Sequence, residues 1–348
     1  MRLSVLDLVP VRTDQTTADA VAASLRLAQT ADRLGFTRYW VAEHHNMPAV
    51  AASSPPVLMA LLASATERIR VGSGGIMLPN HAPLAVAEQV ALLEAAHPGR
   101  IDLGLGRAPG SDPVTSWALR GAAGRDDTDV QKFPQYLHDV MALMGTSGVR
   151  VPIPQQREYL LRATPNAASV ASLWLLGSSM YSAQLAAQQG LPYVFAHHFS
   201  GHGTHEALAH YRENFVPSDV ASEPTTFLTV NATVAPTHEE ALALALPNAQ
   251  NMARLRSGAA LTAIDLVEDA QAAEVPEGQQ AMVDSGLARP VLGDPAGAAD
   301  QLRALAAEFD VDEVMLHPVA SARRGADPRT SPAREATLEL LAKELLSD

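Results

Sequence analysis

Segments with the composition of β-strands recur at a nearly constant interval along the first third of the chain. They begin near residues 3, 37, 70 and 101, and a segment with helical periodicity follows each of them. An interval of about 30 residues is that of one strand and one helix with short connections. Because such units join parallel strands through right-handed crossovers, the interval predicts a parallel sheet with helices outside it.

The pattern continues at longer intervals through the rest of the chain. Further strands are predicted at residues 172–176, 193–196, 227–235 and 314–316. Eight strands and their helices in 348 residues favour an α/β fold of the (β/α)8 barrel type over a doubly wound sheet. Insertions are predicted after strands 4 and 7, at residues 110–170 and 237–292. Within the first of them, the irregular, proline-bearing residues 151–165 are a candidate lid.

Composition and charge exclude several classes of protein. The chain has no cysteine, which excludes disulfides, thiolate metal sites and a cysteine nucleophile. Its formal net charge of -13 argues against nucleic acid as a partner, because a phosphate backbone is bound by basic surface. The first ten residues are mostly apolar but include Asp7, and they are too few for a signal peptide or membrane span. We therefore expect a cytoplasmic protein that binds neither nucleic acid nor membrane.

Small or polar residues directly follow several of the predicted strands. They are His44, His45 and Asn46; Gly74 and Gly75; Gly106 and Arg107; Gly177, Ser178 and Ser179; and His197 and His198. Parallel α/β folds bind their ligands at the carboxyl ends of the strands. These residues are therefore the candidates for a functional site.

Two of the clusters suit a planar or phosphorylated ligand. Arg107 would place a permanent positive charge beside the bare backbone of Gly106. Residues 177–179 lie between a predicted strand and a predicted helix, where backbone N–H groups and hydroxyls can hold a phosphate; a serine that only caps the helix is the alternative. Residues 104–107 superficially resemble a dinucleotide-binding glycine pattern, but Pro109 breaks the GxGxxG spacing and no helix is predicted to begin there.

Two adjacent pairs of histidines follow predicted strands, at residues 44–45 and 197–198. Adjacent side chains of an extended chain point to opposite sides, so at most one of each pair is expected to face a common pocket. Such a histidine could act as a general base or orient a substrate oxygen. His198 and His202 have the i, i+4 spacing of metal ligands and His205 is near, but no HExxH or HxH motif accompanies them and no metal site is predicted. Histidines held only by polar loops remain the alternative.

Five long blocks resemble the bacterial luciferase-like family of flavin-dependent monooxygenases, in particular its single-chain alkanal-monooxygenase-like branch. The blocks are LSVLDLVPV at 3–11, RYWVAEHHNMP at 38–48, RVGSGGIMLPNHAPLAVAEQ at 70–89, GRIDLGLGRAPG at 99–110 and LLGSSMYSAQLAAQQGLPYVFAHHF at 175–199. The resemblance implies that residues 1–348 form a single TIM-barrel domain that binds reduced FMN. In this family, flavin C4a reacts with oxygen to give a peroxide that oxygenates the substrate.

The resemblance also implies which residues bind the cofactor. It places the backbone of Gly74 and Gly75 beneath the flavin ring, often through a non-proline cis peptide, with Met77 beside it. It brings Arg107 and the loop at residues 177–179 to the flavin phosphate. Arg125 is a candidate for a second phosphate ligand.

Catalytic and substrate-binding roles follow from the same resemblance. His44 matches the family histidine nearest the reactive edge of the flavin, which is proposed as a base, and His45 is its neighbour. Asn46, His197 and His198 are expected in the substrate pocket. The resemblance does not extend to light emission, because no cysteine follows Gly106, where luciferase has a reactive one.

The implied function is an FMN-dependent monooxygenase that takes reduced flavin from a separate NAD(P)H:flavin reductase and acts with O2 on a small organic substrate. A homodimer through the apolar helices predicted at residues 55–65 and 84–96 is also expected. Three alternatives stay open. They are hydride transfer with F420 on the same barrel, a non-catalytic flavin-binding protein, and metal-dependent hydrolysis.

Overall fold

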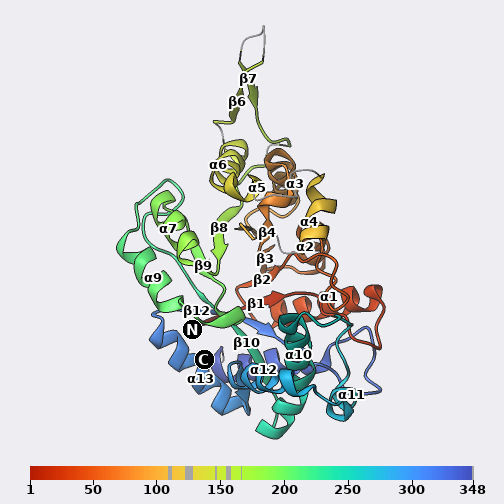
Figure 1. The fold of residues 1–348 in the computed structure, drawn as a ribbon. Coiled ribbons are helices and arrows are strands. Elements are labelled where there is room, and N and C mark those ends of the chain that lie inside the picture. The colour runs from red at the N-terminus through yellow and green to blue at the C-terminus, as the bar shows by residue number, and fades with distance from the viewer. Residues whose placement is uncertain (109–111, 122–127, 146, 154–157, 166, 347–348) are drawn as a thin grey trace.

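A curled parallel sheet forms the centre of the molecule in the computed structural model, which describes residues 1–108, 112–121, 128–145, 147–153, 158–165 and 167–346 (Figure 1). Its strands are β1 (Arg2–Asp7), β2 (Arg38–Val41), β3 (Arg70–Ser73), β4 (Ile76–Met77), β5 (Ile101–Gly106), β8 (Ser172–Gly177), β9 (Tyr193–Phe195), β10 (Leu228–Val234), β11 (Val291–Gly293) and β12 (Glu313–Pro318). They pair in the order β11-β10-β12-β1-β2-β3-β5-β8-β9, and β4 pairs with β5. A parallel bridge between Tyr193 and Thr226 brings β9 to the start of β10, which makes the sheet TIM-barrel-like.

Helices cover the outside of the sheet, as the strand spacing predicts (Figure 1). The longer ones are α1 (Thr17–Arg33), α2 (Pro55–Ala65), α3 (Pro83–Ala96), α6 (Phe133–Met144), α7 (Met180–Gln189), α9 (Thr204–Glu213), α10 (His238–Ser257), α12 (Glu277–Ala288), α13 (Pro295–Glu308) and α14 (Pro332–Leu345). Shorter ones are η1 (Leu78–Asn80), α4 (Pro113–Arg120), α5 (Thr128–Gln131), α8 (His197–Ser200) and α11 (Val267–Ala272). The predicted α/β fold is confirmed. In the described part of the chain, no helix is both long and apolar enough to cross a membrane.

The local structure differs from the sequence prediction in three segments. Residues 70–78 form two short strands instead of one, β3 and β4, with Gly74 and Gly75 between them joined by a cis peptide bond. The predicted irregular segment at 151–165 takes part in an antiparallel hairpin of β6 (Val149–Val151) and β7 (Tyr159–Leu161), which projects from the body in Figure 1. The connection between β10 and β12 carries the additional strand β11, which is too short for a sequence pattern to indicate.

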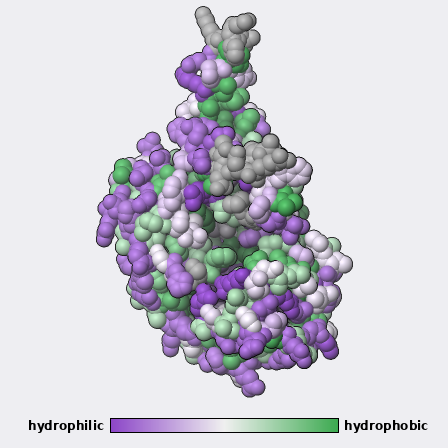
Figure 2. Space-filling model, in the orientation of Figure 1, coloured by the Kyte–Doolittle hydropathy of each residue, from purple (hydrophilic) through white to green (hydrophobic). Residues whose placement is uncertain are grey.

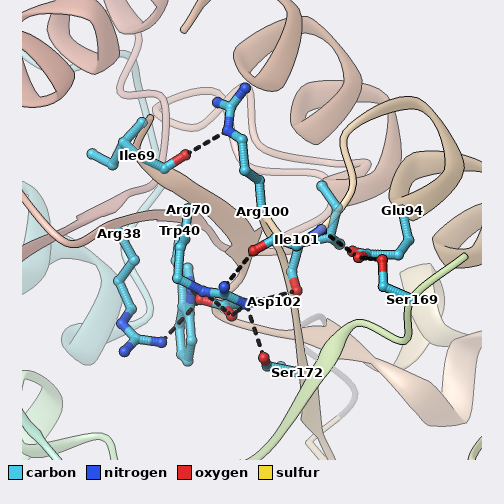
Figure 3. Close-up of polar contacts among 12 residues, drawn as sticks. Arg38, Trp40, Ile69, Arg70, Glu94, Arg100, Ile101, Asp102, Ser169 and Ser172 are labelled. Carbon is cyan, nitrogen blue, oxygen red and sulfur yellow. Dashed lines mark hydrogen bonds and ion pairs between the residues drawn. The ribbon is translucent and has the colours of Figure 1, made fainter. Parts of the chain in front are cut away.

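A buried polar network lies at the amino ends of the strands, opposite the carboxyl ends where the site was predicted (Figure 3). Arg38 of β2 donates to Asp102 of β5 at 2.9 Å and to Glu313 of β12 at 2.7 Å. Asp102 also accepts from Arg70 Nη2 at 2.7 Å and from the Trp40 indole at 2.9 Å. The network therefore links the first residues of four strands across the interior of the sheet.

Aromatic rings fill the interior directly above this network. Trp40, Trp174 and Phe227 pack against one another with ring centroids 5.0 to 5.7 Å apart. The Arg38 guanidinium faces the same rings and lies 4.8 Å from the Trp174 centroid. These contacts fill the interior of the barrel toward the amino ends of the strands.

Candidate active site

A large cavity of about 1090 Å³ lies at the carboxyl ends of the strands. Thirteen of the residues that the sequence places in the site line it: His44, His45, Asn46, Gly74, Gly75, Met77, Gly106, Arg107, Gly177, Ser178, Ser179, His197 and His198. The space-filling view shows a hollow with apolar surface in the middle of the molecule (Figure 2). Because pockets for one small ligand hold about 300–1000 Å³, this cavity has room for a cofactor and a substrate. Arg125 lies outside the described residues.

One wall of the cavity is suited to a phosphate. Ser179 is the N-cap residue of α7, and its side chain makes no capping hydrogen bond. The Ser182 N–H donates to Ser179 O at 3.2 Å. The Ser179 hydroxyl and the N–H groups of Met180 and Tyr181 have no hydrogen-bond partner within the described residues and can face a ligand. The Arg107 guanidinium lies over the Tyr181 ring, 4.2 Å from its centroid. Within the described part of the chain, no carboxylate forms an ion pair with Arg107. A fixed cation and a helix N-terminus thus face the same cavity, as a bound phosphate requires.

Glu43 organises the neighbouring wall, although no sequence pattern singles it out. Its side chain is fully buried, and it accepts hydrogen bonds from His45 Nε2 at 2.8 Å, His81 Nε2 at 2.9 Å and the Met77 N–H at 2.9 Å. Burial raises the pKa of Glu43, but the hydrogen bonds from His81 and His45 outweigh it and leave the pKa below its ordinary value. The ionised carboxylate therefore orients the His45 ring and fixes the backbone just after Gly74 and Gly75.

His44 is placed as a neutral imidazole in the cavity wall. The backbone N–H of His44 donates to Ala52 O at 2.8 Å. The Nδ1 atom of its ring is buried and has no hydrogen-bond partner among the described residues. Burial lowers the pKa of His44 from its ordinary value of 6.5, and the nearby Glu43 only partly offsets this effect. At neutral pH the ring is therefore uncharged and can accept a proton.

The prediction that at most one histidine of each adjacent pair would face a common pocket is wrong. Both members of each pair line the cavity. The chain is not extended at His197 and His198, because α8 begins directly after β9, and adjacent helical side chains are separated by about 100° instead of 180°. At the other pair the chain has already left β2, and Asn46 has a positive φ of 55°.

His317 on β12 lies close to His198 in the cavity wall. The sequence around His317 indicates no role for this residue. His198 Nδ1 lies 2.9 Å from Thr229 Oγ1, and His317 Nδ1 lies 2.9 Å from Asn231 Oδ1. The rings are nearly perpendicular, with centroids 6.0 Å apart. Burial lowers the pKa of His198 to about 4 and that of His317 to about 3. The available signal was the alternation of polar Thr229, Asn231 and Thr233 with apolar residues along this strand.

The histidines with possible metal-ligand spacing are held by separate partners. His205 Nε2 lies 2.8 Å from Glu308 on the surface, while His198 is bound to Thr229 inside the cavity. Among the residues that the structure describes, no group of three or more His, Asp or Glu side chains could hold a metal ion.

Comparison with known proteins assigns the family. The family model for luciferase-like monooxygenases matches residues 1–313. A luciferase-like monooxygenase of Escherichia coli strain K12 is 39% identical over 314 residues, covering 90% of each chain. The chain in the crystal structure of apo-MsnO8 is 31% identical in sequence to this one. The alignment covers 98% of this chain and 97% of that chain, with a TM-score of 0.83. The chain belongs to the luciferase-like monooxygenase family and is an oxidoreductase of that type.

Two more distant structures share the fold. The oxygenating constituent of 3,6-diketocamphane monooxygenase from Pseudomonas putida, solved with FMN, has 17% identity and a TM-score of 0.74, with 99% of this chain and 97% of that chain covered. An F420-dependent secondary alcohol dehydrogenase, solved with an F420-acetone adduct, has 14% identity and a TM-score of 0.62, with 98% of each chain covered. The same fold therefore carries either cofactor in other proteins.

Proposed function

We propose that this protein is an FMN-dependent monooxygenase that oxygenates a small organic substrate with O2, using reduced FMN from a separate NAD(P)H:flavin reductase. The observation that carries the proposal is the arrangement of the 1090 Å³ cavity. Arg107 and the N-terminus of α7 face one part of it, and the uncharged His44 faces it from the end of β2. Membership of the luciferase-like monooxygenase family and the FMN-bound neighbour favour FMN as the cofactor.

The residues present fit FMN. Arg107, Ser178 and Ser179 would hold the phosphate, since they combine a cation with hydroxyls at a helix N-terminus. The backbone of Gly74 and Gly75 would lie against the ring, as bare backbone in the cavity wall allows. When bound, reduced FMN supplies the electrons that activate O2.

The protein's own groups would then orient the reactants. Glu43 would hold His45 and the Met77 N–H in place through its hydrogen bonds, and His44 would act as the base. Asn46, His197 and His198 would border the substrate, because they line the part of the wall that follows β2 and β9. The apolar lining, which includes Leu6, Val194 and Met315, would exclude water from the reaction.

Anaerobic titration of the purified protein with reduced FMN and, separately, with reduced F420 tests the cofactor. We expect saturable binding of reduced FMN, followed by oxygen consumption when air is admitted, measured by stopped-flow absorbance. Binding of F420 alone would replace the proposal with hydride transfer. Binding of neither would mean that this barrel has kept the fold without the cofactor.

Replacing His44 with alanine is expected to lower product formation about 10²–10⁴-fold, the usual contribution of a general base, without changing the affinity for reduced FMN. Since burial holds the pKa of His44 below 6.5, the wild-type rate should fall as pH drops and the ring becomes protonated, with the midpoint of the fall below pH 6.5. The rate is measured on a substrate found by screening, with the surface variant His205→Ala as control. Unchanged turnover and pH profile in His44→Ala would refute the assigned role.

Two alternatives remain distinct from this proposal. Hydride transfer with F420 is supported by the F420-dependent neighbour of the same fold. A non-catalytic flavin-binding protein would bind reduced FMN but form no product from any substrate screened. The cofactor titration therefore distinguishes the F420-dependent enzyme from the monooxygenase, and the substrate screen distinguishes the non-catalytic flavin-binding protein from it.

We also propose that the protein is a homodimer in which α2 and α3 contribute the interface. The two helices contact each other, and on them Val57, Leu61 and Leu92 are 60%, 44% and 61% exposed. Large apolar side chains on adjacent helices favour burial against a second copy, because such a contact removes apolar area from water.

A further inference from the structure

We propose that the substrate binds through an O–H or N–H group to the Nε2 atoms of His198 and His317. The inference deepens the proposed monooxygenase function and rests on it. It concerns only the part of the cavity formed by β10, α8 and β12, where these two rings lie with their centroids 6.0 Å apart. The two acceptors define the chemical class of the substrate.

The hydrogen bonds around Thr229 determine which nitrogen of His198 carries the proton. The Thr229 hydroxyl donates its one hydrogen to Phe195 O at 3.2 Å. Assigning that hydrogen to Phe195 O, which can only accept, makes Thr229 Oγ1 the acceptor for His198 Nδ1, which lies 2.9 Å away. In the neutral ring the hydrogen is then on Nδ1, and Nε2 carries only a lone pair.

The same reasoning applies to His317 through Asn231. The Asn231 amide donates through Nδ2 to His198 O at 2.9 Å, so its oxygen is the atom that faces His317. An amide oxygen only accepts, so His317 Nδ1, at 2.9 Å, is the donor and His317 Nε2 is the bare acceptor. Asn231 and His317 are also register partners on adjacent strands, which fixes the two groups relative to each other.

Both rings are uncharged, and both Nε2 atoms are available to a ligand. Burial lowers the pKa of His198 to about 4 and that of His317 to about 3, and the neighbouring His44 lowers both further. Both residues line the cavity, and neither Nε2 atom has a hydrogen-bond partner in the described ranges of the chain. The lone pairs of the two Nε2 atoms favour a ligand group that donates a hydrogen bond.

The surrounding wall limits the rest of the substrate. Leu6, Leu8, Val230 and Met315 line the same cavity, and they favour a substrate with an apolar body. A simple aldehyde, ketone or ether offers only acceptor oxygens, and the lone pairs of the two Nε2 atoms cannot bind these. We therefore assign the substrate to neutral apolar compounds that carry a hydroxyl or an amide N–H.

Matched probes test this assignment by calorimetry. The probes are 2-naphthol, which has a donor, and 2-methoxynaphthalene, which does not. With wild-type protein in the presence of reduced FMN under anaerobic conditions, 2-naphthol should bind about tenfold more tightly, as expected for one net hydrogen bond. In the double variant His198→Phe/His317→Phe, which keeps ring-shaped side chains but removes the acceptors, this preference should disappear. The surface variant His205→Phe should keep it.

The affinity for reduced FMN, measured in the same samples, separates two kinds of failure. Absence of FMN binding would refute the proposed function itself. If FMN binds but the two probes bind equally, or neither binds, the assignment of a donor-bearing substrate is wrong.

The protonation of the two rings can be measured without any ligand. Long-range 15N–1H correlation spectra of the labelled protein at pH 7 should show both His198 and His317 protonated on Nδ1, with signals assigned through the single Phe variants. A hydrogen on Nε2 of either ring would overturn the inference, because that atom would then be a donor.

Discussion

Replacing Arg38 with alanine should lower the free energy of unfolding by about 3–5 kcal/mol, because it leaves buried carboxylates without their cation. Arg38 donates to Glu313 through Nε at 2.7 Å and Nη2 at 3.1 Å, and to Asp102 at 2.9 Å. Asp102 keeps Arg70 and the Trp40 indole in the variant. Among the described residues, Glu313 keeps only the Ser4 hydroxyl at 2.6 Å and Arg2 at 3.6 Å. Denaturant unfolding followed by circular dichroism measures the change.

The matched control is an ion pair of the same length on the surface. Arg303 and Asp300 are 2.7 Å apart with side chains 53% and 77% exposed, so Arg303→Ala should cost at most about 1 kcal/mol. Adding Glu313→Gln to Arg38→Ala should recover part of the lost stability by removing the stranded charge. Equal losses for Arg38→Ala and Arg303→Ala would show that burial does not govern this network.

Replacing Arg107 with alanine should weaken the binding of reduced FMN about 10–100-fold, the effect of losing a charge-assisted hydrogen bond to a phosphate. Arg107 lines the cavity beside residues 177–179, and its guanidinium is held over Tyr181, 4.2 Å from the ring centroid. The ring restricts the side chain before a ligand binds, which reduces the entropy lost on binding. Anaerobic titration gives the dissociation constants.

Riboflavin provides the control for Arg107 because it has the flavin ring but no phosphate. The wild type and Arg107→Ala should bind reduced riboflavin with equal affinity. Arg150 lies on the exposed β6–β7 hairpin, so the control variant Arg150→Ala should bind both flavins with the affinity of the wild type. If Arg107→Ala weakens riboflavin and FMN to the same extent, then Arg107 acts on the ring or on the fold and does not bind the phosphate.

Much of the architecture could be predicted because it depends on local patterns. The interval between strands and the periodicity of the helical segments indicated a parallel α/β sheet with helices outside it, which the structure has. The carboxyl ends of parallel strands necessarily meet at one end of the sheet. For this reason the amino-acid sequence is enough to assign residues as distant as His44 and Ser179 to one site, and both line the cavity.

Side-chain directions and partners could not be predicted in the same way. The orientation of His197 and His198 depends on where β9 ends and α8 begins, a difference of one or two residues that apolar periodicity does not resolve. Glu43 is a buried carboxylate only because His45, His81 and the Met77 N–H converge on it. No sequence pattern specifies that convergence.

The amino-acid sequence is enough to predict the fold class and the strand ends that surround the cavity, because both follow from periodicity. It also shows the family resemblance, through long matching blocks. The grouping of Thr229, Asn231, His198 and His317 into one hydrogen-bonded cluster arises instead from the folded chain, because register between β10 and β12 and the turn after β9 bring them together. Which nitrogen of each ring carries its proton follows from those contacts. The chemistry that the cavity offers a substrate is therefore a property of packing across strands.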